Sequence, residues 1–303
     1  MPIRREKKID STFWTVPMPD LHLHSTHSDG ILTPDALVSL AMEEGVSPIA
    51  IADHDAVSGV DEAMESGRRR GVQVIPAVEL SVIYSGITDI HLLGYGIDHH
   101  DPQFQERLFL FQRRRDSRSE AIVHRINARL KRQGLSPITY DEVISLADGA
   151  VGRPHIARVM MDRGIVSSME EAFDDYLIPC NVPKEYFPLE EAVHEIHRIG
   201  GIAVLAHPTS MTDDPARMIQ LIDRFIHIGL DGLEAFHSMV PHNECSLLID
   251  HARRHGLIVT GGSDFHGIEE GERVGMIRGE VTIPQWVGAE LERRVRIPVR
   301  DRV

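Results

Sequence analysis

The sequence predicts an α/β fold in which parallel strands alternate with helices, either as a sheet covered on both faces or as a closed barrel. Two observations support this fold class. Short apolar runs of strand length alternate with segments of helical periodicity near both ends of the chain, a pattern typical of parallel β-structure. His, Asp and Glu residues follow these runs repeatedly, and parallel α/β folds carry their functional side chains at the carboxyl ends of the strands.

The N-terminal part of the chain has the order strand, helix, strand, helix, strand. We expect the strands at residues 20–24, 48–53 and 72–78 and the helices at residues 34–44 and 60–70. Thr33 can cap the first helix, and Pro34 fits its first turn. Gly45 and Gly71 suit the left-handed position that ends many helices. The alternation returns at residues 202–206, 231–235 and 257–261, which we predict to be further strands.

The middle of the chain shows helical periodicity and no strand signal. Apolar residues at helical spacing, interleaved with arginines, indicate a long helix over residues 101–134, followed by shorter helices at 139–146, 153–163 and 169–176. Prolines 179, 183 and 188 mark the return to the α/β pattern. We therefore predict a helical insertion, residues 99–189, that covers the functional site of an α/β domain formed by residues 1–98 and 190–303.

The charge balance argues against one class of partner. Lys and Arg number 32 and Asp and Glu number 46, which gives a net charge of −14, whereas proteins that grip long duplex nucleic acid need a basic surface. A small phosphorylated substrate held by a few arginines is compatible with this charge.

Cysteines and apolar runs bear on the compartment. Cys180 and Cys245 are the two cysteines, and they predict neither a disulfide framework nor a thiolate metal site. The basic N-terminal segment has no apolar stretch behind it, so we expect no secretory signal. No apolar run approaches the ~18–20 residues of a membrane span. We expect a cytoplasmic protein that does not associate with membranes.

Histidine is abundant, with 18 residues, and several histidines stand where predicted strands end. His22 and His24 project from one face of the first strand because side chains alternate along a strand. The candidate ligands, which are also the candidate catalytic residues, are His22, His24, Asp29, His54, Glu79, His91, His207, Asp264 and His266. Clustered carboxylates repel one another when buried, and divalent cations relieve that repulsion by coordination. The set exceeds what one ion uses, so it predicts two or three ions.

Five segments resemble, in order, the motifs of the PHP (polymerase and histidinol phosphatase) family. They are Asp20-Leu-His22-Leu-His24-Ser25 with Asp29-Gly30, Asp53-His54-Asp55, Glu79, Ala206-His207-Pro208 and Ser263-Asp264-Phe265-His266. The similarity covers nearly the whole chain, including Gly152-Arg153-Pro154-His155, and is greatest to stand-alone bacterial phosphoesterases of the 3′,5′-nucleoside bisphosphate phosphatase and RNase AM type. It implies a distorted (β/α)7 barrel of the amidohydrolase type with a helical insertion.

The resemblance also implies three metal sites. They are His22, His24, Glu79 and Asp264 for the first ion, Glu79, His91 and His207 for the second, with Glu79 bridging, and Asp29, His54 and His266 for the third. Imidazole and carboxylate ligands suit Mn²⁺, Fe²⁺ or Zn²⁺, and the resemblance favours Mn²⁺.

Five side chains are candidates for binding the substrate. Arginine recognises phosphate through its planar fork, so Arg153 and His155, in the Gly-Arg-Pro-His segment at the start of a predicted helix, are the first candidates. The alternative is that Arg153 only caps a helix or forms a pair at the surface. Arg115 and Arg118 continue the apolar stripe of their helix and point inward or lie at its rim. His237 ends a predicted strand and either lines the site or plays a structural part.

Three further expectations concern residues near these candidates. Lys184 is a weaker candidate for binding the substrate. Asp55 is expected to orient His54. His99 and His100 are expected to be solvated loop residues.

The resemblance and the ligand set together predict a metal-dependent phosphoesterase that removes the 3′-phosphate of nucleoside 3′,5′-bisphosphates and also trims short 5′-phosphorylated oligonucleotides from the 5′ end. One alternative is a phosphatase for a non-nucleotide metabolite such as histidinol phosphate. Another is a non-catalytic phosphate-binding or polymerase-associated module, against which the intact ligand set weighs. The oligomeric state is left open.

Overall fold

The structure, a computed structural model, describes residues 17–146, 151–268, 271–277 and 281–295. Its first strands and helices form where the sequence predicts them. β1 (Met18–Leu23) and β2 (Val46–Ile51) begin two residues before the predicted strands, and α1 (Pro34–Glu44) and α2 (Val60–Arg70) have the predicted bounds. Thr33 caps α1 by accepting a hydrogen bond from the Ala36 N–H at 3.2 Å, and left-handed glycines end both helices as expected.

The third predicted strand is displaced along the chain. β3 (Ala77–Tyr84) starts after Pro76, which has no N–H to donate to a strand ladder. Val74 touches β2 only through an isolated bridge to Ile49. Glu79 therefore lies inside β3 and not at the end of a strand, which corrects the sequence-based placement.

β4 (Ile87–Tyr95) was not predicted, and it runs antiparallel to β3. The two strands are joined by Ser85 and Gly86, whose φ angles of 48° and 83° give the turn that suits a two-residue hairpin. The Ser-Gly pair between two apolar runs is a sequence pattern that could have predicted this turn. The prediction that the strands are all parallel is therefore wrong for β4, and His91 lies in the middle of this strand.

The strands close into a barrel. A sheet of β3, β4, β6 (Ile202–Leu205), β7 (Gly232–Phe236) and β8 (Ile258–Gly261) carries the short edge strand β5 (Phe187–Pro188) beside β3. The segment after β2 joins β3 through an isolated bridge between His54 and Glu79. The segment after β8 joins β1, where the Asp264 N–H donates to the His22 carbonyl at 2.9 Å. β1, β2, β3, β4, β6, β7 and β8 thus form one ring, and the predicted distorted (β/α)7 barrel is confirmed.

Gly262 permits this closure. A Cβ atom added at Gly262 would lie 2.1 Å from the Cβ of His22, far inside van der Waals contact. The chain after β8 can therefore approach β1 only with glycine at this position.

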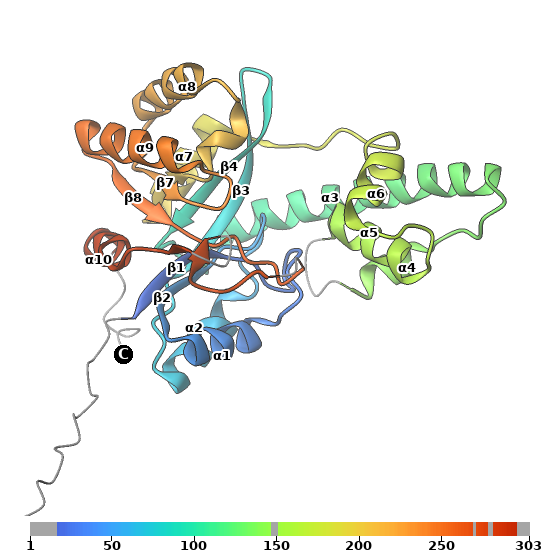
Figure 1. The fold of residues 1–303 in the computed structure, drawn as a ribbon, viewed down its shortest axis with the longest axis horizontal. Coiled ribbons are helices and arrows are strands. Elements are labelled where there is room, and N and C mark those ends of the chain that lie inside the picture. Colours follow the sequence, from blue (N-terminus) through green and yellow to red (C-terminus); the bar gives the residue numbers. More distant parts are fainter. Residues whose placement is uncertain (1–16, 147–150, 269–270, 278–280, 296–303) are drawn as a thin grey trace, which may run out of the picture.

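Helices cover the outside of the barrel (Figure 1). α1 and α2 cover β1 and β2, while α7 (Leu189–Arg198), α8 (Pro215–Ile228) and α9 (His242–His255) pack against β3, β4, β6 and β7. α10 (Gln285–Arg294) packs beside β1 and β8, η2 (Pro208–Met211) follows β6, and β9 (Met276–Ile277) pairs with β10 (Val281–Thr282). None of the described helices is both long and apolar enough to cross a membrane.

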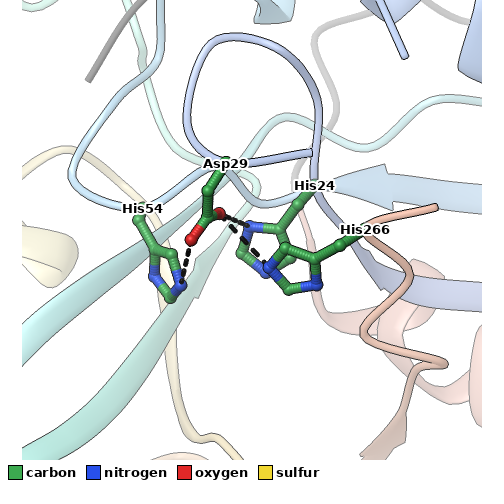
Figure 2. A group of neighbouring side chains, drawn as sticks. All are labelled: His24, Asp29, His54 and His266. Carbon is green, nitrogen blue, oxygen red and sulfur yellow. Dashed lines mark ion pairs between the residues drawn. The ribbon is translucent and has the colours of Figure 1, made fainter. Parts of the chain in front are cut away.

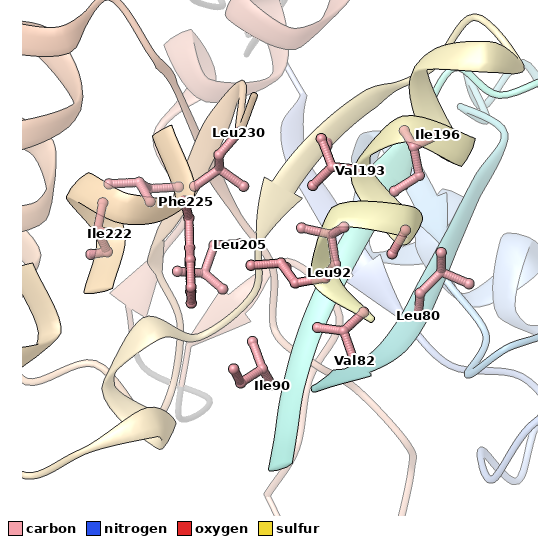
Figure 3. Close-up of a cluster of buried hydrophobic side chains, with 14 of the residues drawn as sticks. Leu80, Val82, Ile90, Leu92, Val193, Ile196, Leu205, Ile222, Phe225 and Leu230 are labelled. Atoms are coloured by element: carbon pink, nitrogen blue, oxygen red, sulfur yellow. The ribbon is translucent and has the colours of Figure 1, made fainter. Parts of the chain in front are cut away.

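Side chains of β3 and β4 alternate between two buried faces. Leu80 and Val82 of β3 and Ile90 and Leu92 of β4 point outward into the core under α7 and α8 (Figure 3). The alternating residues of the same strands point into the barrel. Glu79 is one of these, so the fold delivers a carboxylate to the interior from mid-strand.

The middle of the chain is helical, as predicted, with α3 (Pro102–Arg132), α4 (Tyr140–Ile144), α5 (Arg153–Asp162), α6 (Met169–Ala172) and the π-helix η1 (Phe173–Leu177). The first turns of α3 bury Phe104 and Leu108 in the core outside the barrel. Its second half buries Ile126 and Leu130 in a separate core with α4 to η1. α3 thus connects the two cores (Figure 1), and the boundaries at residues 99 and 189 stay a prediction.

Candidate metal centre

Glu79 stands at the middle of the site, and five histidines surround its buried carboxylate. Oε2 lies 3.2 Å from His22 Nε2, 3.3 Å from His24 Nε2 and 2.9 Å from His54 Nδ1. Oε1 lies 3.0 Å from His91 Nδ1 and 3.3 Å from His207 Nε2. Each oxygen faces a different group of histidines, which is the arrangement of a carboxylate able to bridge two cations.

Asp264 brings a second carboxylate to the same place. Its Oδ1 lies 3.0 Å from His24 Nε2 and 3.4 Å from His22 Nε2, and its Oδ2 lies 3.3 Å from His237 Nε2. Asp264 has a φ of 58° and His207 a φ of 26°. Left-handed backbone at residues other than glycine costs energy and is concentrated at functional sites.

A third group forms around Asp29 (Figure 2). Asp29 Oδ1 lies 3.2 Å from His266 Nε2 and 3.8 Å from His24 Nδ1, while Oδ2 lies 4.0 Å from His54 Nε2. His24, Asp29, His54 and His266 each offer an atom within 4.8 Å of the others'. The nine residues proposed from the sequence as ligands therefore converge on one region of the barrel.

Hydrogen bonds on the outer ring nitrogens set which nitrogen can bind a cation. His22 Nδ1 lies 3.0 Å from Glu234 Oε1, and His266 Nδ1 lies 2.8 Å from the Asp264 carbonyl oxygen. His24 Nδ1 lies 3.3 Å from Ser28 Oγ, whose own proton goes to Asp53. In each case Nδ1 carries the ring proton, and Nε2 presents its lone pair to the centre.

The inward-facing atoms have no hydrogen-bond partners. His22 Nε2, His24 Nε2, His54 Nδ1, Glu79 Oε2 and Asp29 Oδ1 are buried and unpartnered. Unpaired buried polar atoms are costly and rare in proteins. Five such atoms of ligand type within one cluster fit divalent metal ions.

The charges of the centre compensate one another. Burial tends to raise the pKa of Glu79, but His54, His22 and His91 outweigh it and hold the pKa well below its usual value. Burial tends to lower the pKa of His266, but Asp29 raises it to about 10. The pKa of His22 is raised as well, by Glu79, Glu234 and Asp264 against the effect of burial, so protons on His22 and His266 balance carboxylates of the centre and compete with metal ions for the same positions.

Three acidic residues that support the site were not among the predicted site residues, although Asp20 and Asp53 stand in the motif segments. Glu234 is fully buried in β7, beside His22, and also accepts a hydrogen bond from the His207 N–H at 2.8 Å. Asp53 accepts hydrogen bonds from Ser25 and Ser28 and holds the loop after β1, while Asp20 holds the loop after β8 through Ser263. A lone carboxylate within an apolar run, as in Gly-Leu-Glu-Ala-Phe, was the available signal for Glu234.

Basic side chains from α3 and the chain after η1 lie beside the centre. Arg115 forms an ion pair with Asp55 Oδ2 at 2.5 Å and donates to the His54 carbonyl oxygen at 3.3 Å. Arg118 donates to the Val182 carbonyl oxygen at 2.7 Å. These two arginines line a cavity of about 70 Å³ together with Lys184. Lys184 thus belongs to this basic group.

Asp55 pairs with Arg115, and its side chain also accepts hydrogen bonds from the N–H and hydroxyl of Ser81. The structure shows no contact of the Asp55 side chain with the His54 ring; Arg115 bridges from Asp55 to the His54 backbone.

The other candidates from the sequence occupy distinct places. Arg153 lies with its guanidinium carbon 5.4 Å from the centroid of the Phe173 ring. His155 is buried, its Nδ1 accepts from the Gly152 N–H at 3.0 Å, and its Nε2 has no partner. His237 is also buried and contacts Asp264.

The expectation that His99 and His100 are solvated fails for His99. His99 is 8% exposed, because its ring packs beside that of His100 and pairs with Asp61 at 2.9 Å. Both histidines lie on the outside of the barrel near the start of α2.

Known proteins similar to this chain belong to one family or act on related substrates. The profile of the PHP domain family matches residues 20–177. The chain is 34% identical to a 5′-3′ exoribonuclease of Haemophilus influenzae over 88% of this chain and 97% of the relative. It is also 34% identical to a 3′,5′-nucleoside bisphosphate phosphatase of Chromobacterium violaceum, over 92% of this chain and 98% of the relative.

Solved structures agree. A protein of Bifidobacterium adolescentis described as a metal-dependent phosphoesterase superposes with a TM-score of 0.81 and 29% identity, covering 94% of this chain and 99% of that chain. An amidohydrolase of Chromobacterium violaceum, solved with bound sulfate and no metal, superposes with a TM-score of 0.78 and 32% identity over the same shares. By its motifs, its barrel and these relatives, the chain belongs to the PHP family.

Proposed function

We propose that this protein is a metal-dependent hydrolase of phosphoric esters that removes the 3′-phosphate of nucleoside 3′,5′-bisphosphates. The observation that carries the proposal is the convergence of unpartnered imidazole and carboxylate atoms beside a cavity lined by arginine and lysine. The named activities of the bisphosphate phosphatase and exoribonuclease relatives support the substrate class.

The ligand groups are those expected from the resemblance. His22, His24, Glu79 and Asp264 would hold one ion, Glu79, His91 and His207 would hold a second, and Asp29, His54 and His266 would hold a third. Bound divalent ions supply a hydroxide near neutral pH and neutralise phosphoryl oxygens. Mn²⁺ is the proposed ion, with Fe²⁺ and Zn²⁺ compatible with the same donors.

His155 is the proposed proton donor. Because Nδ1 accepts the Gly152 N–H, the ring proton resides on Nε2, which is buried and unpartnered. Burial lowers the pKa of His155, and the negative charge of Asp29, a member of the third ligand group, opposes that shift. His155 Nε2 thus donates to a phosphoryl oxygen or to the departing 3′-oxygen.

His237 has the same tautomer for the same reason. Its Nδ1 accepts the Met239 N–H at 3.0 Å, so the proton lies on Nε2, toward Asp264. His237 is therefore a hydrogen-bond donor to Asp264 or to the substrate and not a metal ligand.

A second phosphate is held by the basic cavity. Burial lowers the pKa of Arg118, with Arg153 and Arg115 adding to the shift, and burial together with Arg115 lowers the pKa of Lys184 to about 8. Arg115, Arg118 and Lys184 line the same cavity and repel one another. A 5′-phosphate there would relieve their repulsion and favour substrates with two phosphates.

The same geometry accounts for trimming of oligonucleotides from the 5′ end. With the 5′-phosphate in the basic cavity, the phosphorus on the 3′-oxygen of the same nucleotide would lie at the metal ligands. Attack by hydroxide at this phosphorus would break its bond to the 3′-oxygen, which would leave with a proton. A phosphomonoester then gives inorganic phosphate, whereas a diester gives a mononucleotide and a shorter RNA with a new 5′-phosphate.

A substrate panel tests the proposal. Mn²⁺-loaded protein is assayed with adenosine 3′,5′-bisphosphate, a short 5′-phosphorylated RNA, the same RNA with a 5′-hydroxyl, and histidinol phosphate. We expect turnover of the first two, loss of activity with chelator, and recovery with Mn²⁺. Turnover of histidinol phosphate alone would refute the nucleotide assignment, and full activity after removal of all metal would refute the metal mechanism.

A further inference from the structure

The metal centre has a recognisable signature: a histidine nitrogen and a carboxylate oxygen within ion-pair distance, both buried and both without a hydrogen-bond partner. Within the described ranges, the signature recurs at one place outside the barrel. His251 Nε2 of α9 lies 3.0 Å from Asp223 Oδ1 of α8, and both atoms are buried and unpartnered. The His251 side chain is 4% exposed.

A second histidine completes the group. His255 follows His251 by one helical turn, so both rings lie on the same face of α9. His255 Nε2 is 3.9 Å from the same oxygen, Asp223 Oδ1, and the two rings are 4.6 Å apart between centroids. Two histidines at this spacing on one helix face are a recurrent zinc-binding arrangement.

We propose that Asp223, His251 and His255 bind a zinc-class divalent cation that joins α8 to α9, separate from the centre in the barrel. Tetrahedral Zn²⁺ with bonds of about 2.0–2.1 Å places its ligand atoms roughly 3.3 Å apart. The observed separations of 3.0 Å and 3.9 Å lie on either side of that value. Water fills the remaining position on the exposed side of His255.

The surroundings suit a cation. The site lies in the last turn of α9 (His242–His255), where the carbonyl ends of the helix carry partial negative charge. Burial lowers the pKa of His251, while the negative charge of Asp223 opposes that shift. His227 does not compete with His251 and His255 for the Asp223 carboxylate, because its Nδ1 bonds to the Asp223 backbone carbonyl oxygen.

Arg254 is the one opposing group among these contacts. Its Nη2 lies 3.5 Å from His251 Nδ1, the ring nitrogen that must carry the proton when Nε2 binds a metal. Arg254 is exposed and can swing into solvent. Its removal should therefore tighten metal binding.

A second histidine and aspartate outside the barrel, His99 and Asp61, lack the unpartnered atoms of this site. His99 Nε2 and Asp61 Oδ1 also lie close, at 2.9 Å, but they form an ordinary hydrogen bond. That pair is hydrogen-bonded, whereas His251 Nε2 and Asp223 Oδ1 are buried atoms without a hydrogen-bond partner.

Zinc titration of the Mn²⁺-loaded protein tests the proposal. Zn²⁺ bound per chain is counted after gel filtration, and the rise in Tm is recorded against Zn²⁺ concentration. We expect His255→Ala and Asp223→Asn to bind one zinc fewer, or to bind it at least about tenfold more weakly, and to lose the zinc-dependent part of the Tm rise. Hydrolytic activity with Mn²⁺ should be unchanged.

Two matched variants sharpen the result. His242→Ala removes an exposed imidazole from the other end of α9 and should behave as wild type. Arg254→Gln should bind zinc more tightly, since it removes the opposing cation and offers an acceptor to Nδ1. Equal zinc content and equal Tm shifts in all variants would overturn the proposal, as would weaker binding in Arg254→Gln.

Discussion

Glu234 Oε1 lies 3.0 Å from His22 Nδ1, and both side chains are fully buried. Burial tends to raise the pKa of Glu234, but His22 and His237 outweigh it and keep the pKa below its usual value, so the carboxylate is ionised and accepts the ring proton of His22. Metal-binding histidines are commonly oriented in this way by a carboxylate. β7 thereby holds the ring that β1 provides.

Glu234→Gln should weaken metal binding. The amide keeps the shape of the side chain but makes His22 less basic, and loss of such an outer partner costs about 10–100-fold in metal affinity. Metal content after dialysis against graded chelator measures the change. Glu244→Gln, at a half-buried position on α9, is the control. Unchanged affinity in Glu234→Gln would mean that the contact with His22 is only structural.

Gly262→Ala should disrupt barrel closure. The added Cβ would lie 2.1 Å from the Cβ of His22, so the strand carrying Asp264 must move away from β1. Overpacking of this kind costs about 1–3 kcal/mol, measurable by urea denaturation, and should also lower metal content. Gly86→Ala in the hairpin turn is the control. Its added Cβ would meet nothing within 4 Å, and the φ of Gly86 is 83°, so this substitution introduces backbone strain without a steric clash.

Arg153→Ala should reduce kcat/KM for adenosine 3′,5′-bisphosphate by about ten- to a hundredfold, since one charge-assisted phosphate contact contributes about 1.5–3 kcal/mol. Slow hydrolysis of a simple aryl phosphate should be almost unaffected. Arg129→Ala is matched, because Arg129 also lies over an aromatic ring, that of Tyr176. Equal losses on both substrates would assign Arg153 to the fold or to the metal centre.

Asp101 should make stability depend on pH in the acid range. Arg198 lowers the pKa of Asp101 from 3.8 to about 2, with the Phe104 N–H contributing. The unfolded chain takes up this proton first, so the stabilisation is complete above pH 3.8 and is lost as the pH falls toward 2. Asp101→Asn retains a capping side chain but lacks the ion pair.

The difference in unfolding free energy between wild type and Asp101→Asn should therefore shrink across that window. Urea denaturation at several pH values measures it. A difference that stays constant from pH 6 to pH 2 would show that Asp101 acts as a cap alone.

Local chemistry determined much of this protein. The bounds of α1 and α2 follow from Thr33, Pro34 and their terminal glycines, because capping depends on residues adjacent in sequence. The positions of most strands could also be predicted, because an apolar run of strand length is a local pattern in the sequence. The motif residues identified the family, because metal ligands of fixed type must stand at fixed places in the chain.

Tertiary structure decided the rest. β4 runs antiparallel because a two-residue turn reverses the chain, and the apolar pattern of a strand buried on both faces does not encode its direction. Glu234 orients His22 across 212 positions of sequence, and His251 meets Asp223 only because α8 and α9 pack side by side. Such contacts depend on how elements pack against one another, which no local pattern of residues specifies.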